Sequence, residues 1–238
     1  MVNELLALLK KDNHKAPVVD TGMAIREASY VAVDTELTGL NEKKDSIVSI
    51  GAVRIKDGKL NLGDTFYRLV SPETKLRKES VVIHGIMPSE LDKEPSIDEV
   101  IYEFVKFCGD DVIIGHCLSI DLAFMNKELK RIIGYSLKNP AVDTFAIHEW
   151  LIERLPSYRE LFRAQKQLGL YQIAKSFGIP SGGAHNAEMD AYVTAQIFQR
   201  FVPMLAGAGI ERMGDLLKLG NPYKGGGDFK LSCGISNF

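Results

Sequence analysis

Residues 46–56 (SIVSIGAVRIK) form a long run rich in β-branched residues, a composition that is typical of a buried β-strand. The run ends at Asp57-Gly58, a dipeptide that favours the tight turn of a hairpin, so a second strand is expected over residues 59–70. A compact apolar run, residues 30–34 (YVAVD), comes before both. The chain is therefore expected to begin its core with a meander of strands.

After this meander the pattern changes to strands that alternate with helices. Ser96 is followed three residues later by Glu99, which is the spacing of a capping box, and apolar residues then recur at helical spacing up to residue 108. Two short strands are expected next, at residues 112–116 and 141–143, and each is followed by a helix. Two later helices are expected at residues 169–177 and 186–204. This order predicts an α/β protein with a mixed sheet flanked by helices.

The length of the chain is enough for one large domain with its own core, because it has 238 residues of which 45% are hydrophobic. The expected division is an N-terminal helical extension over residues 1–27, a domain over residues 28–204 and a C-terminal tail over residues 205–238. The leucine-rich run at residues 5–9 is too short to span a membrane and lacks the basic start of a signal peptide. No membrane partner is therefore expected.

The charge of the chain gives no general attraction to nucleic acid, because the formal net charge is −2. Any nucleic-acid binding must be local. One candidate is the basic segment at residues 154–166, where Tyr158 and Phe162 are interleaved with arginine and lysine. This composition suits phosphate contact and base stacking, but it also suits a solvated helix face, and the sequence leaves both open.

The cysteines bear on the cellular compartment. Cys108, Cys117 and Cys233 are odd in number and show no CxxC spacing, which argues against a disulfide framework or a structural zinc site. A buried thiol is therefore expected at Cys117. A cytoplasmic location fits this pattern best.

Acidic residues are placed where a metal site could form. Asp34 and Glu36 lie two positions apart at the end of a strand, so their side chains point to the same face. Two carboxylates this close repel each other unless a cation neutralises them, and oxygen ligands suit Mg²⁺ or Mn²⁺ rather than zinc. Taken singly, the pair could also be solvated acids, Asp121 a first-turn helix acid and His185 a structural residue.

Three stretches together resemble the three motifs of the DEDDh, or DnaQ-like, 3′→5′ exonucleases. They are residues 31–39 (VAVDTELTG), 113–124 (IIGHCLSIDLAF) and 184–191 (AHNAEMDA), and their order and spacing match as well. The resemblance covers residues 30–204 and implies a ribonuclease H-like fold with a five-stranded mixed sheet flanked by helices. Leu37, Cys117 and Ile120 stand where the family usually has Thr, Asn and Phe, which concerns the shape of the substrate groove and not the acidic positions.

By motif position, the resemblance implies a role for each acidic residue and for two histidines. The residues expected to bind two Mg²⁺ or Mn²⁺ ions are Asp34, Glu36, Asp121 and Asp190. Asp34 is the expected bridge between the ions, and His185 is the expected general base. A further stretch, residues 82–86 (VIHGI), resembles the family segment that packs against the terminal nucleotide. The residues expected to contact the substrate are Leu37, Thr38, Gly39, His84 and Ile86.

The activity that the resemblance implies is hydrolysis of single-stranded DNA from the 3′ end to nucleoside 5′-monophosphates, with RNA as a second candidate substrate. The alternatives are an RNA-trimming exoribonuclease and a non-catalytic nucleic-acid-binding module of the same fold. The expected partners are a single-stranded 3′ end and a polymerase or another replication or repair protein. The sequence leaves open whether the chain acts alone, as a proofreading subunit or as a homodimer.

Overall fold

The computed structural model describes residues 16–163, 169–182 and 185–224. The leucine-rich run at residues 5–9, the glycine-rich stretch at residues 225–227 and Cys233 lie outside the described residues. The proposed N-terminal helix and C-terminal tail are therefore described only in part.

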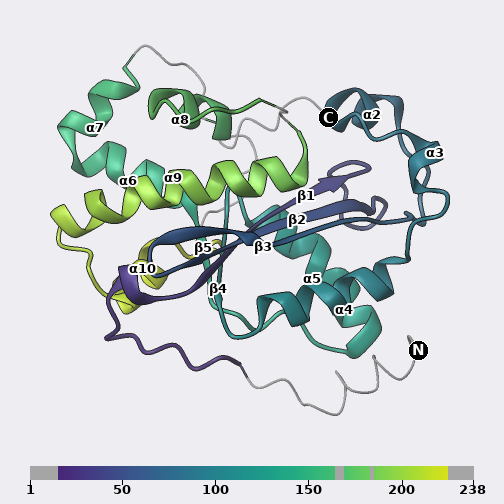
Figure 1. The fold of residues 1–238 in the computed structure, drawn as a ribbon, viewed down its shortest axis with the longest axis horizontal. Coiled ribbons are helices and arrows are strands. Elements are labelled where there is room, and N and C mark those ends of the chain that lie inside the picture. The colour runs from purple at the N-terminus through teal and green to yellow at the C-terminus, as the bar shows by residue number, and fades with distance from the viewer. Residues whose placement is uncertain (1–15, 164–168, 183–184, 225–238) are drawn as a thin grey trace.

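A five-stranded mixed sheet forms the centre of the fold (Figure 1), and its strands are β1 (Tyr30–Leu37), β2 (Ile47–Lys56), β3 (Lys59–Leu69), β4 (Val112–Gly115) and β5 (Ala141–Asp143). Their order in the sheet is β3-β2-β1-β4-β5. The first three strands are antiparallel, and β4 and β5 are parallel to β1. Asp57 and Gly58 both have positive φ, as the expected turn between β2 and β3 requires. The predicted mixed sheet is confirmed.

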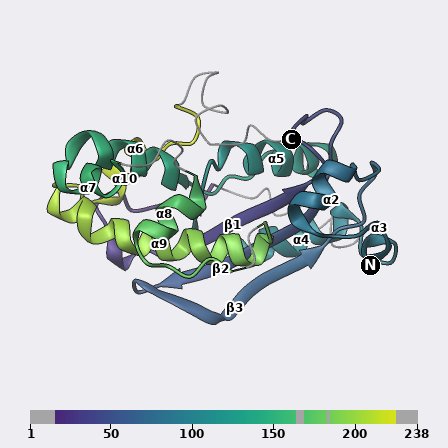
Figure 2. The same cartoon turned by 90° about the horizontal axis from the view of Figure 1, so that it is seen from above.

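Helices cover both faces of this sheet (Figures 1 and 2): α2 (Lys78–His84), α3 (Pro88–Leu91), α4 (Ile97–Cys108), α5 (Ser119–Ile133), α6 (Thr144–Arg154), α7 (Pro156–Leu161), α8 (Leu170–Ser176), α9 (Ala187–Gly207) and α10 (Met213–Leu219). Successive strand residues point to opposite faces, so Val33 packs in a core with Phe104 of α4, whereas Ala32 packs in a core with Phe198 of α9. The sheet is thus the middle layer of three.

The described parts of the terminal segments pack on this domain. The backbone N–H of Met213 donates to the carbonyl of Met23 at 3.0 Å, and the hydroxyl of Tyr30 donates to the carbonyl of Ile25 at 2.6 Å. After the end of α10, the carbonyl of Gly220 accepts a hydrogen bond from the N–H of Asp143, on the edge strand β5, at 2.7 Å. The segment assigned to the tail therefore includes a helix, α10, that is fixed to the rest of the fold. The three-part division of the chain stays a prediction.

The cysteines differ from the expectation in one position. Cys108 is free and buried, but Cys117 is disulfide-bonded. The expected thiol at Cys117 is therefore wrong, and the cysteines no longer argue for a reducing compartment. The cytoplasmic location stays a prediction. Within the described residues, no helix combines the length and the apolar composition that crossing a membrane requires.

Candidate active site

Three carboxylates from two distant parts of the chain converge at one point. Asp34 and Glu36 lie on β1, and Asp190 lies in the first turn of α9. One ligand oxygen from each lies within 4.8 Å of the other two. Glu36 and Asp190 are buried, and Asp34 is half-buried. The strand brings its two acids to one face because side chains two positions apart point the same way.

Asp121 is the fourth carboxylate of the site. It lies in the first turn of α5, and its Oδ1 accepts hydrogen bonds from both the N–H and the hydroxyl of Thr35, at 2.9 and 2.6 Å. These two bonds fasten the start of α5 to β1 between Asp34 and Glu36. The charge of Asp121 also raises the pKa of Asp34, which places the two carboxylates within electrostatic reach of each other. The structure therefore brings all four predicted acidic residues together.

The four carboxylates are held where their ionised forms are disfavoured. Burial, followed by repulsion from the other three acids, raises the pKa of Asp34 well above its usual range. Burial likewise raises the pKa of Glu36 to about 8, of Asp121 to about 7 and of Asp190 to about 6. Buried like charges need a positive partner, and a set of oxygen donors suits a hard divalent cation. This cluster is thus the place on the described chain where such a cation fits.

His185 lies beside the carboxylate of Asp190, and His84 lies near His185. His185 immediately precedes the N-cap of α9, Asn186, whose side chain accepts from the N–H groups of Glu188 and Met189. His84 ends α2 and is 8% exposed; its Nδ1 accepts from the N–H of Ile86 at 3.1 Å, and its Nε2 has no hydrogen-bond partner among the described residues. Burial and the nearby His185 both lower the pKa of His84. The structure therefore brings the VIHGI segment next to the third motif.

The other residues expected to contact the substrate are mostly buried: Leu37, Thr38 and Gly39 lie at the end of β1 and just after it, and Ile86 packs with Val48 of β2. Leu37 is 4% exposed, Ile86 is 8% exposed and Thr38 is fully buried. The hydroxyl of Thr38 accepts from the N–H of Ser46 at 3.0 Å. A Cβ atom on Gly39 would lie 2.6 Å from a carboxylate oxygen of Asp45, so glycine fits that position. Thr38 and Gly39 thus shape the loop after β1, and substrate contact by these residues stays a prediction.

In the described part of the basic segment, residues 154–163, both aromatic rings pack in the core. Tyr158 and Phe162 are 2% and 4% exposed, and their rings lie against the imidazole of His148 in the core. The guanidinium of Arg159 donates to the carbonyls of Ile152 and Glu153 at the end of α6. These aromatic rings are therefore not available to stack on bases.

Tyr171 is a site residue that the sequence did not reveal. It lies on α8, and its hydroxyl accepts from the N–H of His185 at 2.7 Å and donates to a carboxylate oxygen of Asp190. A single tyrosine on a short helix carries no spacing signal that would connect it to residues 14 and 19 positions later.

Comparison with known families matches residues 31–198 to the family described as Exonuclease. The chain belongs to this exonuclease family. The resemblance of its motifs to the DnaQ-like 3′→5′ exonucleases is thereby confirmed. The three motifs and the four clustered carboxylates all lie within the matched residues.

Two relatives show where such exonuclease domains occur. Over 193 residues the exonuclease is 33% identical to the PolC-type DNA polymerase III of Thermotoga maritima, covering 81% of this chain but 13% of that protein. It is 31% identical to the DNA polymerase III subunit epsilon of Aquifex aeolicus, covering 75% of this chain and 83% of the subunit. This chain thus spans a small part of the first relative and most of the second.

A solved structure confirms the fold. Escherichia coli Exonuclease I in complex with a dT13 oligonucleotide superposes with a TM-score of 0.63, at 16% identity, covering 76% of this exonuclease and 42% of that chain. At this identity the likeness concerns the fold, and it confirms the expected ribonuclease H-like architecture.

Proposed function

We propose that this chain is a 3′→5′ exonuclease that hydrolyses single-stranded DNA to nucleoside 5′-monophosphates with two divalent cations. The observation that carries the proposal is the convergence of Asp34, Glu36 and Asp190 within 4.8 Å, with Asp121 beside them. Membership of the exonuclease family supports it. The two DNA polymerase III relatives support DNA as the substrate.

The four carboxylates fit Mg²⁺ or Mn²⁺ because they offer only hard oxygen donors, are buried or half-buried, and form no ion pair with a lysine or arginine among the described residues. In the proposal the four carboxylates would hold two such ions, and Asp34 would be their shared ligand; the charges of all three other acids raise its pKa. When bound, two such cations would stabilise the charge on the attacking and leaving oxygens at phosphorus.

The chain's own residues supply the remaining steps. In the proposal, the imidazole of His185 takes one proton from the attacking water as the water oxygen bonds to phosphorus and the bond from phosphorus to the 3′ oxygen breaks. The leaving 3′ oxygen takes up a proton from solvent and becomes the 3′-hydroxyl of the shortened strand. In the proposal, the few exposed atoms of Leu37 and Ile86 contact the base of the terminal nucleotide, and the segment around His84 packs beside them; Nε2 of His84 is itself buried and has no hydrogen-bond partner among the described residues. The products are a nucleoside 5′-monophosphate and a strand that is one nucleotide shorter.

A gel assay tests this function directly. Single-stranded DNA and RNA of one sequence, labelled at the 5′ end, are incubated with Mg²⁺, Mn²⁺ or excess chelator. We expect a ladder that shortens from the 3′ end with either metal and no cleavage with chelator, and we expect DNA to be cut faster. Faster cleavage of RNA would favour an RNA-trimming enzyme. Binding of DNA without cleavage under any metal would favour a non-catalytic module.

We further infer a DNA polymerase as partner, because one relative is by name a DNA polymerase III of the PolC type and the other is the subunit epsilon of DNA polymerase III. The test is gel filtration of the full chain with and without a purified bacterial replicative polymerase subunit. Co-elution supports the partnership. Separate elution at micromolar concentrations of both proteins, together with cleavage by the chain alone, would favour a free enzyme.

A further inference from the structure

One tyrosine hydroxyl connects the two functional residues of the third motif. The hydroxyl of Tyr171 accepts a hydrogen bond from the N–H of His185 at 2.7 Å and donates its own proton to Oδ1 of Asp190. The rings of Tyr171 and His185 also meet edge to face, with centroids 5.6 Å apart. A single side chain from α8 therefore contacts both the candidate general base and a candidate metal ligand.

The backbone at His185 needs such a partner. Its φ is +63°, in the left-handed region that residues other than glycine adopt only where their surroundings hold them. The hydrogen bond to Tyr171 holds its N–H group, and the side-chain cap of Asn186 begins α9 at the next residue. The direction of the His185 side chain thus depends on a turn that Tyr171 fastens at one end.

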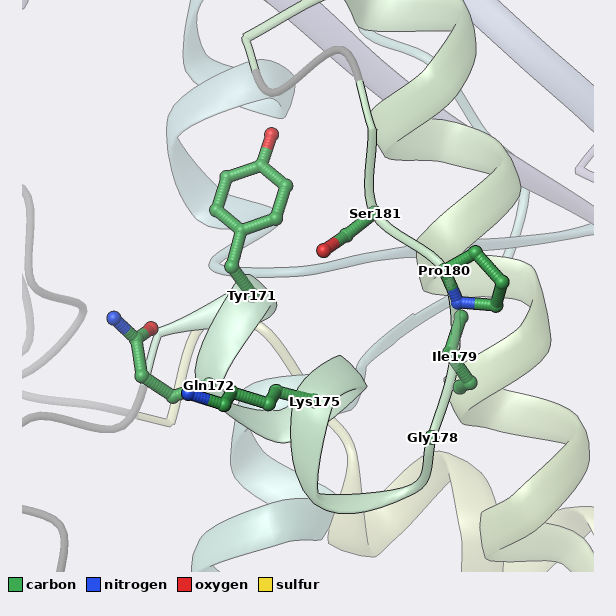
Figure 3. Close-up of a pocket in the computed structure, with 7 residues that line it drawn as sticks. All are labelled: Tyr171, Gln172, Lys175, Gly178, Ile179, Pro180 and Ser181. Carbon is green, nitrogen blue, oxygen red and sulfur yellow. The ribbon is translucent and has the colours of Figure 1, made fainter.

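Packing alone does not explain the position of Tyr171. Its ring lines an open cavity of about 480 Å³ (Figure 3), together with Gln172, Lys175, Gly178, Ile179, Pro180 and Ser181. In this view Ser181 points toward the ring, and the tyrosine hydroxyl projects away from α8. Because one side of the ring borders a cavity, the two hydrogen bonds of the hydroxyl have a large share in fixing the side chain.

We propose that Tyr171 is a positioning residue, which orients the carboxylate of Asp190 toward a bound cation and the imidazole of His185 toward the attacking water. The Tyr171 hydroxyl holds Oδ1 of Asp190, the residue that contributes one oxygen to the cluster with Asp34 and Glu36, so the hydrogen bond restricts how this carboxylate can turn. Partners that orient metal ligands in this way typically change metal affinity or activity by about 10–100-fold when they are removed. The assignment rests on the proposed function.

The test compares two substitutions that each remove one tyrosine hydroxyl bonded to a histidine residue. Tyr171→Phe removes the bridge, whereas Tyr158→Phe removes the hydroxyl that lies 2.5 Å from Nδ1 of His148 in the core. We expect Tyr171→Phe to lower kcat by about 10–100-fold with little change in KM for DNA. Its affinity for Mn²⁺, measured by calorimetry without DNA, should fall by a similar factor. Tyr158→Phe should lower the melting temperature and keep both quantities.

The outcomes separate this assignment from the proposed function. If Tyr171→Phe keeps kcat and Mn²⁺ affinity within about twofold of those of Tyr158→Phe, the positioning role is wrong. A melting temperature for Tyr171→Phe far below that of Tyr158→Phe would make the bridge a structural device and would also overturn the role. If the wild-type chain degrades no nucleic acid with any metal, the proposed function fails, while the comparison of Mn²⁺ affinities still tests the orientation of Asp190.

Discussion

Gly51 of β2 lies so close to Ala187 at the start of α9 that a Cβ atom on the glycine would sit 2.2 Å from the Ala187 carbonyl carbon. Gly51 is also the residue that pairs with Asp34 across the sheet. The missing side chain therefore lets α9 begin directly against the strand pair that carries Asp34. This close approach is what brings Asp190 to the carboxylates of β1.

Gly51→Ala should consequently disturb both the fold and the site. The clash is with backbone atoms, which cannot rotate away as a side chain can. We therefore expect the free energy of unfolding to fall by about 1–3 kcal/mol and the exonuclease activity to fall strongly. Gly63→Ala is the matched control, because a Cβ there meets only a side-chain oxygen at 3.7 Å. The measurement compares the melting temperature and the initial rate of DNA cleavage of both variants with those of the wild type. A Gly51→Ala protein with wild-type melting temperature and rate would show that α9 does not need this approach.

Cation binding should release protons at neutral pH. Burial and mutual repulsion raise the pKa of Glu36 to about 8 and of Asp121 to about 7, so part of the cluster is protonated at pH 7 before a cation binds. Because the cation requires the ionised forms, its affinity should rise as the pH rises from 6 to 8. Calorimetry of Mn²⁺ binding in two buffers with different ionisation heats measures the protons released.

The control for this titration is Glu36→Gln, which removes one titrating ligand and should release fewer protons per cation at pH 7. Equal Mn²⁺ affinity at pH 6 and pH 8, with no release of protons from the wild type, would contradict the cluster as the cation site.

The base role of His185 is best tested with asparagine. His185 has a left-handed backbone, which asparagine tolerates better than alanine does, so His185→Asn removes the imidazole with the least strain. We expect kcat to fall by a factor of about 10²–10⁴ with little change in KM. The acidic limb of the pH–rate profile should also change. If the rate and the profile both stay as in the wild type, His185 has a structural role.

The free energy of unfolding should fall in mild acid because of a buried histidine outside the carboxylate cluster. His148 is fully buried beside Tyr158, and burial lowers its pKa to about 4. The unfolded chain takes up this proton near pH 6.5 but the folded chain does so only near pH 4, so the stabilisation present above pH 6.5 is lost as the pH falls through this window. The loss amounts to roughly 3 kcal/mol for the whole window.

Urea unfolding between pH 4.5 and 7.5 measures this loss, and His148→Gln isolates it, because glutamine does not titrate. The difference in unfolding free energy between wild type and variant should shrink as the pH falls. A constant difference across the range would mean that His148 does not carry the effect.

The strands were predictable because their signal is local. The β-branched run and the Asp57-Gly58 turn of β2 and β3 need no knowledge of the rest of the chain. The end of β1 was harder, since the apolar run ends at Asp34 whereas the strand continues to Leu37. Asp34 and Glu36 are polar but still pair with Gly51 and Ser49 of β2. Hydrophobic patterning therefore fails to predict the part of a strand that carries polar residues of a functional site.

The contacts that complete the site could not be predicted, because they join positions without a shared period. Tyr171 meets Asp190 across 19 residues, and α10 is fixed by a bond between Met213 and Met23. Neither contact changes the local pattern of apolar residues. The four acids could be predicted only because their motifs occur together and in order. Each acid taken singly could equally be a solvated surface residue or a first-turn helix residue.

The last prediction concerns how the protein recognises the 3′ end of a DNA strand. If Ile86 contacts the terminal base, frayed or mismatched 3′ ends should be cut faster than paired ones, because a duplex end must first lose pairing and stacking at a cost of a few kcal/mol. Ile86→Ala should then raise KM for single-stranded DNA. Leu91→Ala is the matched control, because Leu91 shares the small buried cluster of Ile86 and Val48 without an expected base contact, so it should lower stability alone. Cleavage of single-stranded, mismatched and paired DNA by all three proteins gives the answer. Equal wild-type rates on the three substrates would refute recognition by fraying, and equal KM values for the two variants would remove Ile86 from the contact.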